Sequence, residues 1–194
     1  LSGEITPSGN KNEALPVLAA VLLTEEPVIL RNIPNIADIA DMKILLEELG
    51  VTITAMEKNT FQFQTTSIRS DSPSIELASR IRGSFLIAGA MLARHGSIHL
   101  PSPGGDKIGL RPVNTHLLAL KSMGVQIELD QEGNYHMFAK RLEGSDIYLD
   151  ETSVMGTENA IMAAVMAWGR TTIYNAASEP HVQGLCHLLT AMGA

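Results

Sequence analysis

The sequence predicts an α/β fold made of three similar repeats, with the helices in the centre and the sheets outside. Residues 19–50, 88–124 and 163–193 each run from an apolar, Ala-rich helix through a short β-rich strand to a second helix that ends at a glycine. A recurring period of this kind is the signature of a repeat architecture. Strands that alternate with helices, together with hairpins, indicate mixed strand direction. The apolar run over residues 160–167 suits a helix buried on more than one side, which places the helices inside.

The first repeat, residues 11–65, follows a short strand that we expect at residues 3–6. Its expected elements are a helix, a strand, a second helix and a hairpin, at residues 13–23, 27–32, 38–49, 51–54 and 60–64. Pro27 suits the first position of a strand, where no ladder donor is lost. We expect Asp38 to cap the second helix and Gly50 to end it. The hairpin segments alternate apolar and polar residues, as half-buried strands do.

The other two repeats cover residues 66–140 and 141–194. In the second we expect strands and helices at residues 66–69, 77–94, 97–100, 111–123, 125–129 and 135–139. Pro112 lies near the start of a helix, where proline is tolerated. In the third we expect them at residues 146–149, 157–168, 170–174 and 179–192. The third repeat lacks the final hairpin of the other two, so we expect the chain to be a piece of a longer protein.

The middle repeat carries a Pro/Gly-rich loop that the other two repeats lack. Asn32 to Gly50 and Asn175 to Gly193 both span eighteen residues, whereas the matching stretch of the middle repeat is longer. The extra length lies in residues 101–109. Insertions in one repeat map to surface loops, often on the working face. We therefore expect functional residues in this loop.

Composition limits the class of protein. The chain has 194 residues, 45% of them apolar and 18% charged, which suits a globular domain and argues against disorder. A net charge of −7 disfavours a nucleic-acid partner. No apolar run is long enough for a membrane span, and no signal peptide is recognised. The single cysteine, Cys186, excludes an intramolecular disulfide, and we interpret it as a buried structural thiol in a cytoplasmic protein.

Three groups of residues suggest anion chemistry. Ser8-Gly9-Asn10-Lys11-Asn12 precedes a helix, and a helix N-terminus with an adjacent lysine attracts anions. Arg80 and Arg82 lie in an otherwise apolar helix and need partners. The simpler alternatives are a capped helix with a solvated lysine, and a structural ion pair with Glu76.

The third group is the loop itself. Asp106 lies in the loop, and Arg111, Asn114 and His116 follow it closely. A carboxylic acid beside arginines can deliver a proton to a bound anion. The alternative is an ordinary solvated aspartate in a turn.

Other kinds of site find little support. His95 and His99 flank Gly96 and do not share a helical face, so we predict no metal site. No Walker A or dinucleotide-binding glycine pattern is present, and we predict no cofactor. Ser153 or Thr157 is expected to cap the helix that follows.

Four segments in this order resemble the enolpyruvyl transferases: residues 8–16, 82–84, 103–116 and 153–159. The resemblance covers the whole chain, and its most specific parts are the Lys-Asn segment and the Gly-Gly-x-x-Ile-Gly-x-Arg-Pro-Val run. It implies two lobes of three repeats each in an inside-out α/β barrel arrangement. Residues 1–10 would be a crossover strand from a second lobe, absent here, and residues 11–194 most of the lobe that bears the catalytic loop.

The resemblance also implies a reaction and its site residues. The 3-hydroxyl of UDP-N-acetylglucosamine would attack phosphoenolpyruvate, with release of phosphate. Lys11 and Asn12 match the pair that contacts phosphoenolpyruvate, Arg82 an arginine of the cleft, and Asp106 the proton donor of the loop. Positions that match nucleotide contacts, or lie beside them, are Arg111, Pro112, Val113, Asn114, Thr115, His116, Ser153 and Val154.

Departures from the family pattern qualify these roles. The loop donor is usually cysteine, so Asp106 implies resistance to fosfomycin, which alkylates that cysteine. Asn114 replaces an aspartate, Glu151 a lysine and Met155 a glycine. Two alternatives stay open: a family member that uses shikimate 3-phosphate as acceptor, and a lobe that binds anions without turnover.

Overall fold

The computed structural model describes residues 2–104 and 112–194, and it contains three repeats. The first comprises α1 (Lys11–Ala20), the 3-10 helix η1 (Val21–Leu23), β1 (Val28–Leu30), α2 (Ala37–Leu49), β2 (Thr52–Glu57) and β3 (Thr60–Gln64). The second comprises α3 (Ile75–Ala78), the 3-10 helix η2 (Arg82–Leu86), α4 (Ile87–Arg94), β4 (Ser97–Leu100), α5 (Asn114–Ser122), β5 (Gln126–Leu129) and β6 (Tyr135–Phe138). The third comprises β7 (Asp146–Tyr148), α6 (Val154–Ala164), β8 (Thr172–Tyr174) and α7 (Pro180–Ala191).

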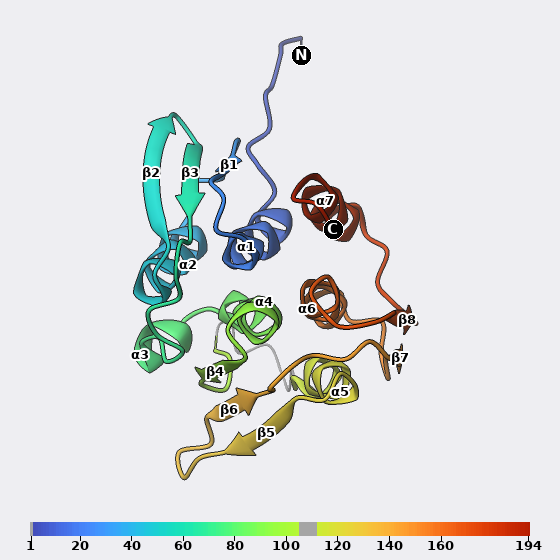
Figure 1. Cartoon of the computed structure of the whole chain (residues 1–194). Coiled ribbons are helices and arrows are strands. Elements are labelled where there is room, and N and C mark those ends of the chain that lie inside the picture. The colour runs from blue at the N-terminus through green and yellow to red at the C-terminus, as the bar shows by residue number, and fades with distance from the viewer. Residues whose placement is uncertain (1, 105–111) are drawn as a thin grey trace.

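Among the described residues, the helices lie inside and three small sheets lie at the periphery, as predicted (Figure 1). Two of the sheets are antiparallel with the orders β1-β3-β2 and β4-β6-β5, so the second hairpin strand is central in each. The third sheet pairs β7 with β8 in parallel across the α6 connection. Strand direction is therefore mixed, and each repeat contributes one sheet.

The core lies where the first long helices of the three repeats meet. Helices α1, α4 and α6 contact one another. Small side chains such as Ala20, Ala88 and Ala163 are fully buried there, and one hydrophobic cluster includes residues of all three repeats. Gly89 of α4 allows a close approach to α6, because a Cβ at this position would lie 2.4 Å from the backbone oxygen of Asn159. The apolar helices thus pack against each other as well as against the sheets.

Backbone conformation repeats along with the elements. The glycines that follow α2, α5 and α7, namely Gly50, Gly124 and Gly193, have φ of 114°, 93° and 108°. Asn32 and Asn175, which precede α2 and α7 at the same spacing, have φ of 58° and 57°. Glycine and asparagine tolerate this left-handed region best, which explains why these residue types recur.

One expected helix is broken. Residues 77–94 form α3, η2 and α4 instead of one helix, and Ile81 between them is extended (φ −123°, ψ 135°). The Ser84 hydroxyl lies 2.7 Å from the Ala78 oxygen and 2.8 Å from the Ile81 oxygen. A serine hydroxyl that binds nearby carbonyls competes with regular helix hydrogen bonds. The break moves Arg82 to the start of a new turn.

Several other boundaries differ. The strands expected at residues 3–6 and 66–69 are not formed, because neither segment has the ladder pairing that defines a strand. Asp38 lies in the first turn of α2 and Ile36 is its N-cap, so the aspartate does not cap the helix. Helix α6 begins at Val154, three residues early, because Ser153 caps it, and it ends four residues early. Cys186 is half-buried where a buried thiol was expected.

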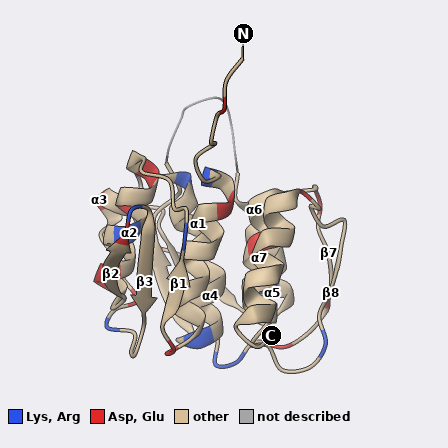
Figure 2. Cartoon of the chain, turned by 90° about the horizontal axis from the view of Figure 1, so that it is seen from above, with Lys and Arg blue, Asp and Glu red and all other residues tan. Residues whose placement is uncertain are grey.

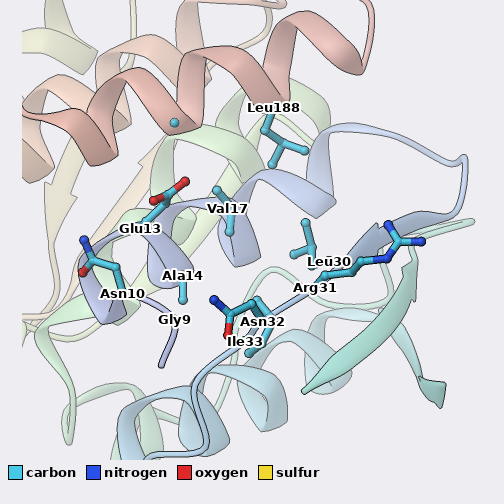
Figure 3. A pocket seen from close by; sticks show the side chains of 11 residues that line it. Gly9, Asn10, Glu13, Ala14, Val17, Leu30, Arg31, Asn32, Ile33 and Leu188 are labelled. Carbon is cyan, nitrogen blue, oxygen red and sulfur yellow. The ribbon is translucent and has the colours of Figure 1, made fainter. Parts of the chain in front are cut away.

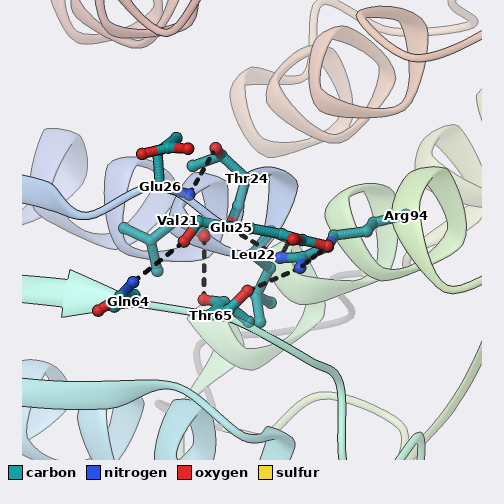
Figure 4. A network of polar contacts seen from close by, with 8 residues as sticks. All are labelled: Val21, Leu22, Thr24, Glu25, Glu26, Gln64, Thr65 and Arg94. Carbon is teal, nitrogen blue, oxygen red and sulfur yellow. Dashed lines mark hydrogen bonds and ion pairs between the residues drawn. The ribbon is translucent and has the colours of Figure 1, made fainter.

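Arg94 joins the first two repeats (Figure 4). Its guanidinium donates to the carbonyl oxygens of Leu22 and Thr24 at 2.8 Å each and of Thr65 at 2.6 Å, and the Glu25 carboxylate lies 3.5 Å away. The planar fork of donors in arginine suits three carbonyls at once.

Within residues 2–104 and 112–194, no helix has both the length and the apolar character that crossing a bilayer requires.

Candidate functional site

A cavity of about 590 Å³ lies at one end of the helix layer. Its walls come from the starts of α1, α2 and α7, from α6, and from residues 80–86 around the break between α3 and η2. The lining residues are Lys11, Asn12, Leu15, Asp38, Arg80, Ile81, Arg82, Gly83, Leu86, Val154, Met155, Glu158, Glu179 and His181. Basic and acidic residues meet at the end of the helix layer where the N-terminal segment joins α1 (Figure 2).

The N-terminal ends of several helices lie around the cavity. Lys11 and Asn12 open α1, Asp38 lies in the first turn of α2, and Arg82 opens η2. Val154 opens α6, and His181 is in the first turn of α7. Each helix start carries partial positive charge and unpaired backbone N–H groups. Several starts around one cavity favour an anionic ligand.

Lys11 is held at the cavity by its helix and by an aspartate. Asn10 caps α1, with its side-chain oxygen accepting from the backbone N–H of Asn12 at 2.9 Å. The ammonium of Lys11 lies 3.0 Å from the Asp38 carboxylate, and both side chains are partly exposed. An exposed ion pair contributes little to stability. Lys11 therefore remains available to a ligand that offers a second negative charge.

Arg80 and Arg82 reach the cavity with different partners. Arg80 pairs with Glu76 at 2.8 Å one helical turn away, which confirms the structural ion pair considered for it. The Arg82 guanidinium donates to the backbone oxygen of Pro112 at 3.1 Å. Arg82 thus connects the cavity to the chain that leaves the loop of the middle repeat.

Residues 112–116 divide between surface and interior. Pro112 and Asn114 are exposed, whereas Val113, Thr115 and His116 are buried. The Thr115 hydroxyl donates to the Asp150 carboxylate at 2.7 Å. None of these five residues lines the cavity. Their expected contacts with a nucleotide stay predictions.

His116 is a neutral interior histidine. Its Nδ1 lies 2.8 Å from the amide nitrogen of Asn159, and its ring packs edge-on against Phe85. Because an amide nitrogen can only donate, His116 Nδ1 accepts and its proton is on Nε2. Burial, with a smaller contribution from Arg82, lowers the pKa of His116 to about 3. The imidazole therefore carries no charge at neutral pH.

The start of α6 combines a cap with a cavity wall. The Ser153 hydroxyl accepts from the backbone N–H of Gly156 at 3.2 Å, which confirms the expected cap. Val154 and Met155 then line the cavity.

Asp106 and Arg111, the two loop residues expected at the site, lie outside the described residues.

Four ionisable residues of the cavity were not anticipated as candidates: Asp38, Glu158, Glu179 and His181. Glu158 had a sequence signal, because it is an acidic residue inside an apolar helix, as the two arginines are. Asp38, Glu179 and His181 had none, because acidic and polar residues are common in the first turn of any helix. Among the described residues, no group of three or more His, Cys, Asp or Glu could hold a metal ion.

A second cavity of about 290 Å³ lies between α1, β1 and α7 (Figure 3). Gly9, Asn10, Glu13, Leu30, Asn32 and Leu188 are among its lining residues, and Arg31 points away from its centre. A Cβ at Gly9 would lie 1.8 Å from the Asn32 backbone oxygen. Only glycine at position 9 therefore lets the segment before α1 pass this close to Asn32. Gly9 and Asn10 of the candidate segment before α1 line this cavity, but Lys11, Asn12 and Arg82 do not.

Comparison with known proteins decides the family. The family model described as EPSP synthase (3-phosphoshikimate 1-carboxyvinyltransferase) matches residues 1–194. The chain belongs to this family of enolpyruvyl transferases. Two relatives named UDP-N-acetylglucosamine 1-carboxyvinyltransferase are 52% identical, from Treponema denticola, and 48% identical, from Bradyrhizobium diazoefficiens. Each is matched by 100% of this chain, which covers 45% and 44% of the respective relative.

Solved enolpyruvyl transferases share the fold. The enolpyruvyl transferase NikO from Streptomyces tendae superposes with a TM-score of 0.86 at 23% identity, over 100% of this chain and 45% of that one. EPSP synthase from Acinetobacter baumannii gives 0.75 at 17% identity, over 98% and 44%. The chain therefore spans somewhat less than half of the proteins it matches, and its inside-out arrangement of helices and sheets is that of one lobe of this family.

Proposed function

We propose that this chain is the loop-bearing lobe of an enzyme that transfers the enolpyruvyl group of phosphoenolpyruvate to the 3-hydroxyl of UDP-N-acetylglucosamine. Phosphate leaves, and the product is a peptidoglycan precursor. One observation carries the proposal: Lys11, Asn12, Arg82 and Val154, from three separate sequence motifs, line one cavity. The names of the relatives at 52% and 48% identity support the choice of acceptor.

The charges of the cavity suit the chemistry of this transfer. Phosphoenolpyruvate carries a phosphate and a carboxylate, and negative charge develops on the phosphate as it leaves. Lys11, Arg82 and the converging helix starts would stabilise that charge without reorganisation during the reaction. Asp106 would deliver the proton to C3 of phosphoenolpyruvate. A second lobe would close the cavity, and a cytoplasmic location remains a prediction.

A turnover assay on the protein expressed from its complete reading frame tests the proposal. UDP-N-acetylglucosamine and shikimate 3-phosphate are offered separately with phosphoenolpyruvate, and phosphate release is followed. We expect phosphate release when the acceptor is UDP-N-acetylglucosamine and none when it is shikimate 3-phosphate. Turnover with shikimate 3-phosphate alone would refute the choice of acceptor, and no turnover with either would favour a lobe that only binds anions.

Two substitutions test the cavity itself. Lys11→Met and Arg82→Met each remove a cation, and we expect each to lower kcat/KM by about 100-fold or more, as loss of one stabilising charge does. Arg141→Met is the matched control, because Arg141 pairs with Glu143 on the exposed surface. Wild-type kcat/KM in Lys11→Met would exclude its proposed role.

A further inference from the structure

Glu158 is a buried acid in the wall of the proposed anion site. Its side chain lines the cavity, yet the residue is only 1% exposed. Within the described part of the chain, Glu158 Oε1 has no hydrogen-bond partner. The neighbouring side chains make their hydrogen bonds elsewhere: Thr157 with Ser153 and Ala177, and Asn159 with Phe85, Gly89 and His116. Glu158 therefore places a buried, unpartnered carboxyl oxygen in the wall of the cavity.

The surroundings of Glu158 favour its protonated form. Burying an unpaired carboxylate costs several kcal/mol, so such a group takes up a proton instead. Burial, with a further contribution from Glu179, raises the pKa of Glu158 to about 8. At neutral pH the side chain is then a carboxylic acid, which has an O–H donor that a carboxylate lacks.

A neutral acid and a charged one have opposite effects on a bound anion. A carboxylate at position 158 would repel a phosphate or carboxylate held near Lys11 and Arg82. A carboxylic acid instead adds an O–H donor to the wall of the site, from a side chain that is itself buried. The protonated side chain therefore supplies recognition without adding positive charge to a site that already has lysine and arginines.

We propose that Glu158 donates a hydrogen bond, as a neutral carboxylic acid, to a phosphate or carboxylate oxygen of the ligand bound in this cavity. The inference rests on the anion site proposed above and adds a specificity-determining residue to it. Anion binding then depends on one proton of the protein, and it weakens when that proton is lost.

Other charged groups face the same space. They are Lys11 from α1, Asp38 from α2, Arg80 and Arg82 at η2, and Glu179 and His181 at the start of α7. On the α5 side of α6, His116 stays neutral with a pKa of about 3. His181 lines the same cavity, so a His181 variant is needed as a control for the effect of Glu158.

Sulfate binding to the protein expressed from its complete reading frame, followed by calorimetry, tests the proposal. Sulfate keeps its charge between pH 6.5 and 9.5, so any pH dependence belongs to the protein. We expect wild-type affinity to fall about 30-fold over this range, because pH 9.5 lies about 1.5 units above the pKa of Glu158, about 8, and binding requires its proton. Lys11→Met should abolish the binding, which locates it in the cavity.

Three variants separate the possibilities. Glu158→Gln keeps a donor and cannot ionise, so its affinity should match the wild type within about twofold at pH 6.5 and stay constant to pH 9.5. Glu158→Met removes the donor and should bind about tenfold more weakly at pH 6.5, the effect of one hydrogen bond to a charged group. His181→Gln should retain the wild-type decline.

Several results would overturn the proposal: no sulfate binding, a flat wild-type profile, a Glu158→Gln profile that declines like the wild type, or wild-type affinity in Glu158→Met. If a variant fails to fold, carbon NMR of the Glu158 carboxyl in the wild type decides, since titration near pH 4.5 would also overturn it. A protein that binds sulfate as described but turns over neither acceptor refutes the proposed function and leaves this inference standing.

Discussion

Glu158 and His116 are buried titratable side chains whose surroundings oppose their charged forms. His116 lies on α5 and Glu158 on α6, and their ionisation affects the pH dependence of stability with opposite signs. The lowered pKa of His116, about 3 against 6.5, costs stability as pH falls below 6.5. The raised pKa of Glu158, about 8 against 4.5, costs stability as pH rises above 4.5.

The Glu158 effect can be measured on its own. Glu158→Gln removes the ionisation, so its stability should equal that of the wild type near pH 4.5 and exceed it at pH 8. The difference should grow by at most about 1.4 kcal/mol per pH unit. Urea unfolding at both pH values provides the measurement. A constant difference between the two variants at these pH values would show that Glu158 ionises freely in the folded state.

Asp106 leads to a prediction about inhibition. Fosfomycin alkylates a cysteine, and the chain has one, Cys186, on α7. We expect the active protein to resist the drug and the Asp106→Cys variant to be inactivated with time, because a thiolate is the stronger nucleophile. Activity after incubation and mass spectrometry of position 106 provide the measurement. Rapid inactivation of the wild type would contradict the prediction.

At the scale of elements, the α4–α6 contact depends on one glycine. A methyl group at position 89 would lie 2.4 Å from the Asn159 backbone oxygen, and the Gly89 N–H bonds the Asn159 side chain at 2.8 Å. Gly89→Ala should therefore destabilise the chain by about 1–3 kcal/mol in urea unfolding. Gly3→Ala is the matched control, since nothing lies within 4 Å of its added Cβ. Equal stability of the two variants would mean that the helices can separate at no cost.

The junction between α4 and the end of η1 depends on arginine rather than on positive charge alone. Arg94 reaches the carbonyl oxygens of Leu22 and Thr24 from Nη1 and that of Thr65 from Nη2, whereas a lysine would have to reach all three from one nitrogen. We expect Arg94→Lys to cost about 1–3 kcal/mol, because buried acceptors lose their donors. Arg141→Lys, in an exposed pair with Glu143, should change the stability by less than about 1 kcal/mol. Thermal unfolding distinguishes the two variants.

At the scale of the whole molecule, the three repeats share one hydrophobic core. A single hydrophobic cluster includes residues of every repeat, and α1, α4 and α6 contact one another directly. This differs from a linear solenoid, in which each repeat contacts only its neighbours. We expect one cooperative thermal transition whose calorimetric and van't Hoff enthalpies agree. Separate transitions, or a calorimetric enthalpy well above the van't Hoff value, would indicate that repeats unfold independently.

The amino-acid sequence by itself determined the repeat, the order of its elements and the family. Period, helix and strand patterning and turn glycines are local properties, and they persist in the fold as the positive φ of Gly50, Gly124 and Gly193. Local patterning failed where a side chain competed with the backbone. Ser84 bonds carbonyls around the break between α3 and η2, and no periodicity reports such a bond.

Only the tertiary structure decided which motif residues share a cavity. Lys11, Arg82 and Val154 are far apart in the chain, and they meet because α1, η2 and α6 begin at the same end of the helix layer. Burial is likewise a property of the packed molecule: it places Thr115 and His116 in the interior and makes Glu158 an unpaired acid in the cavity wall. Residues that are neighbours in the sequence are enough to specify a helix. The dielectric surroundings of a side chain, in contrast, depend on every element packed around it.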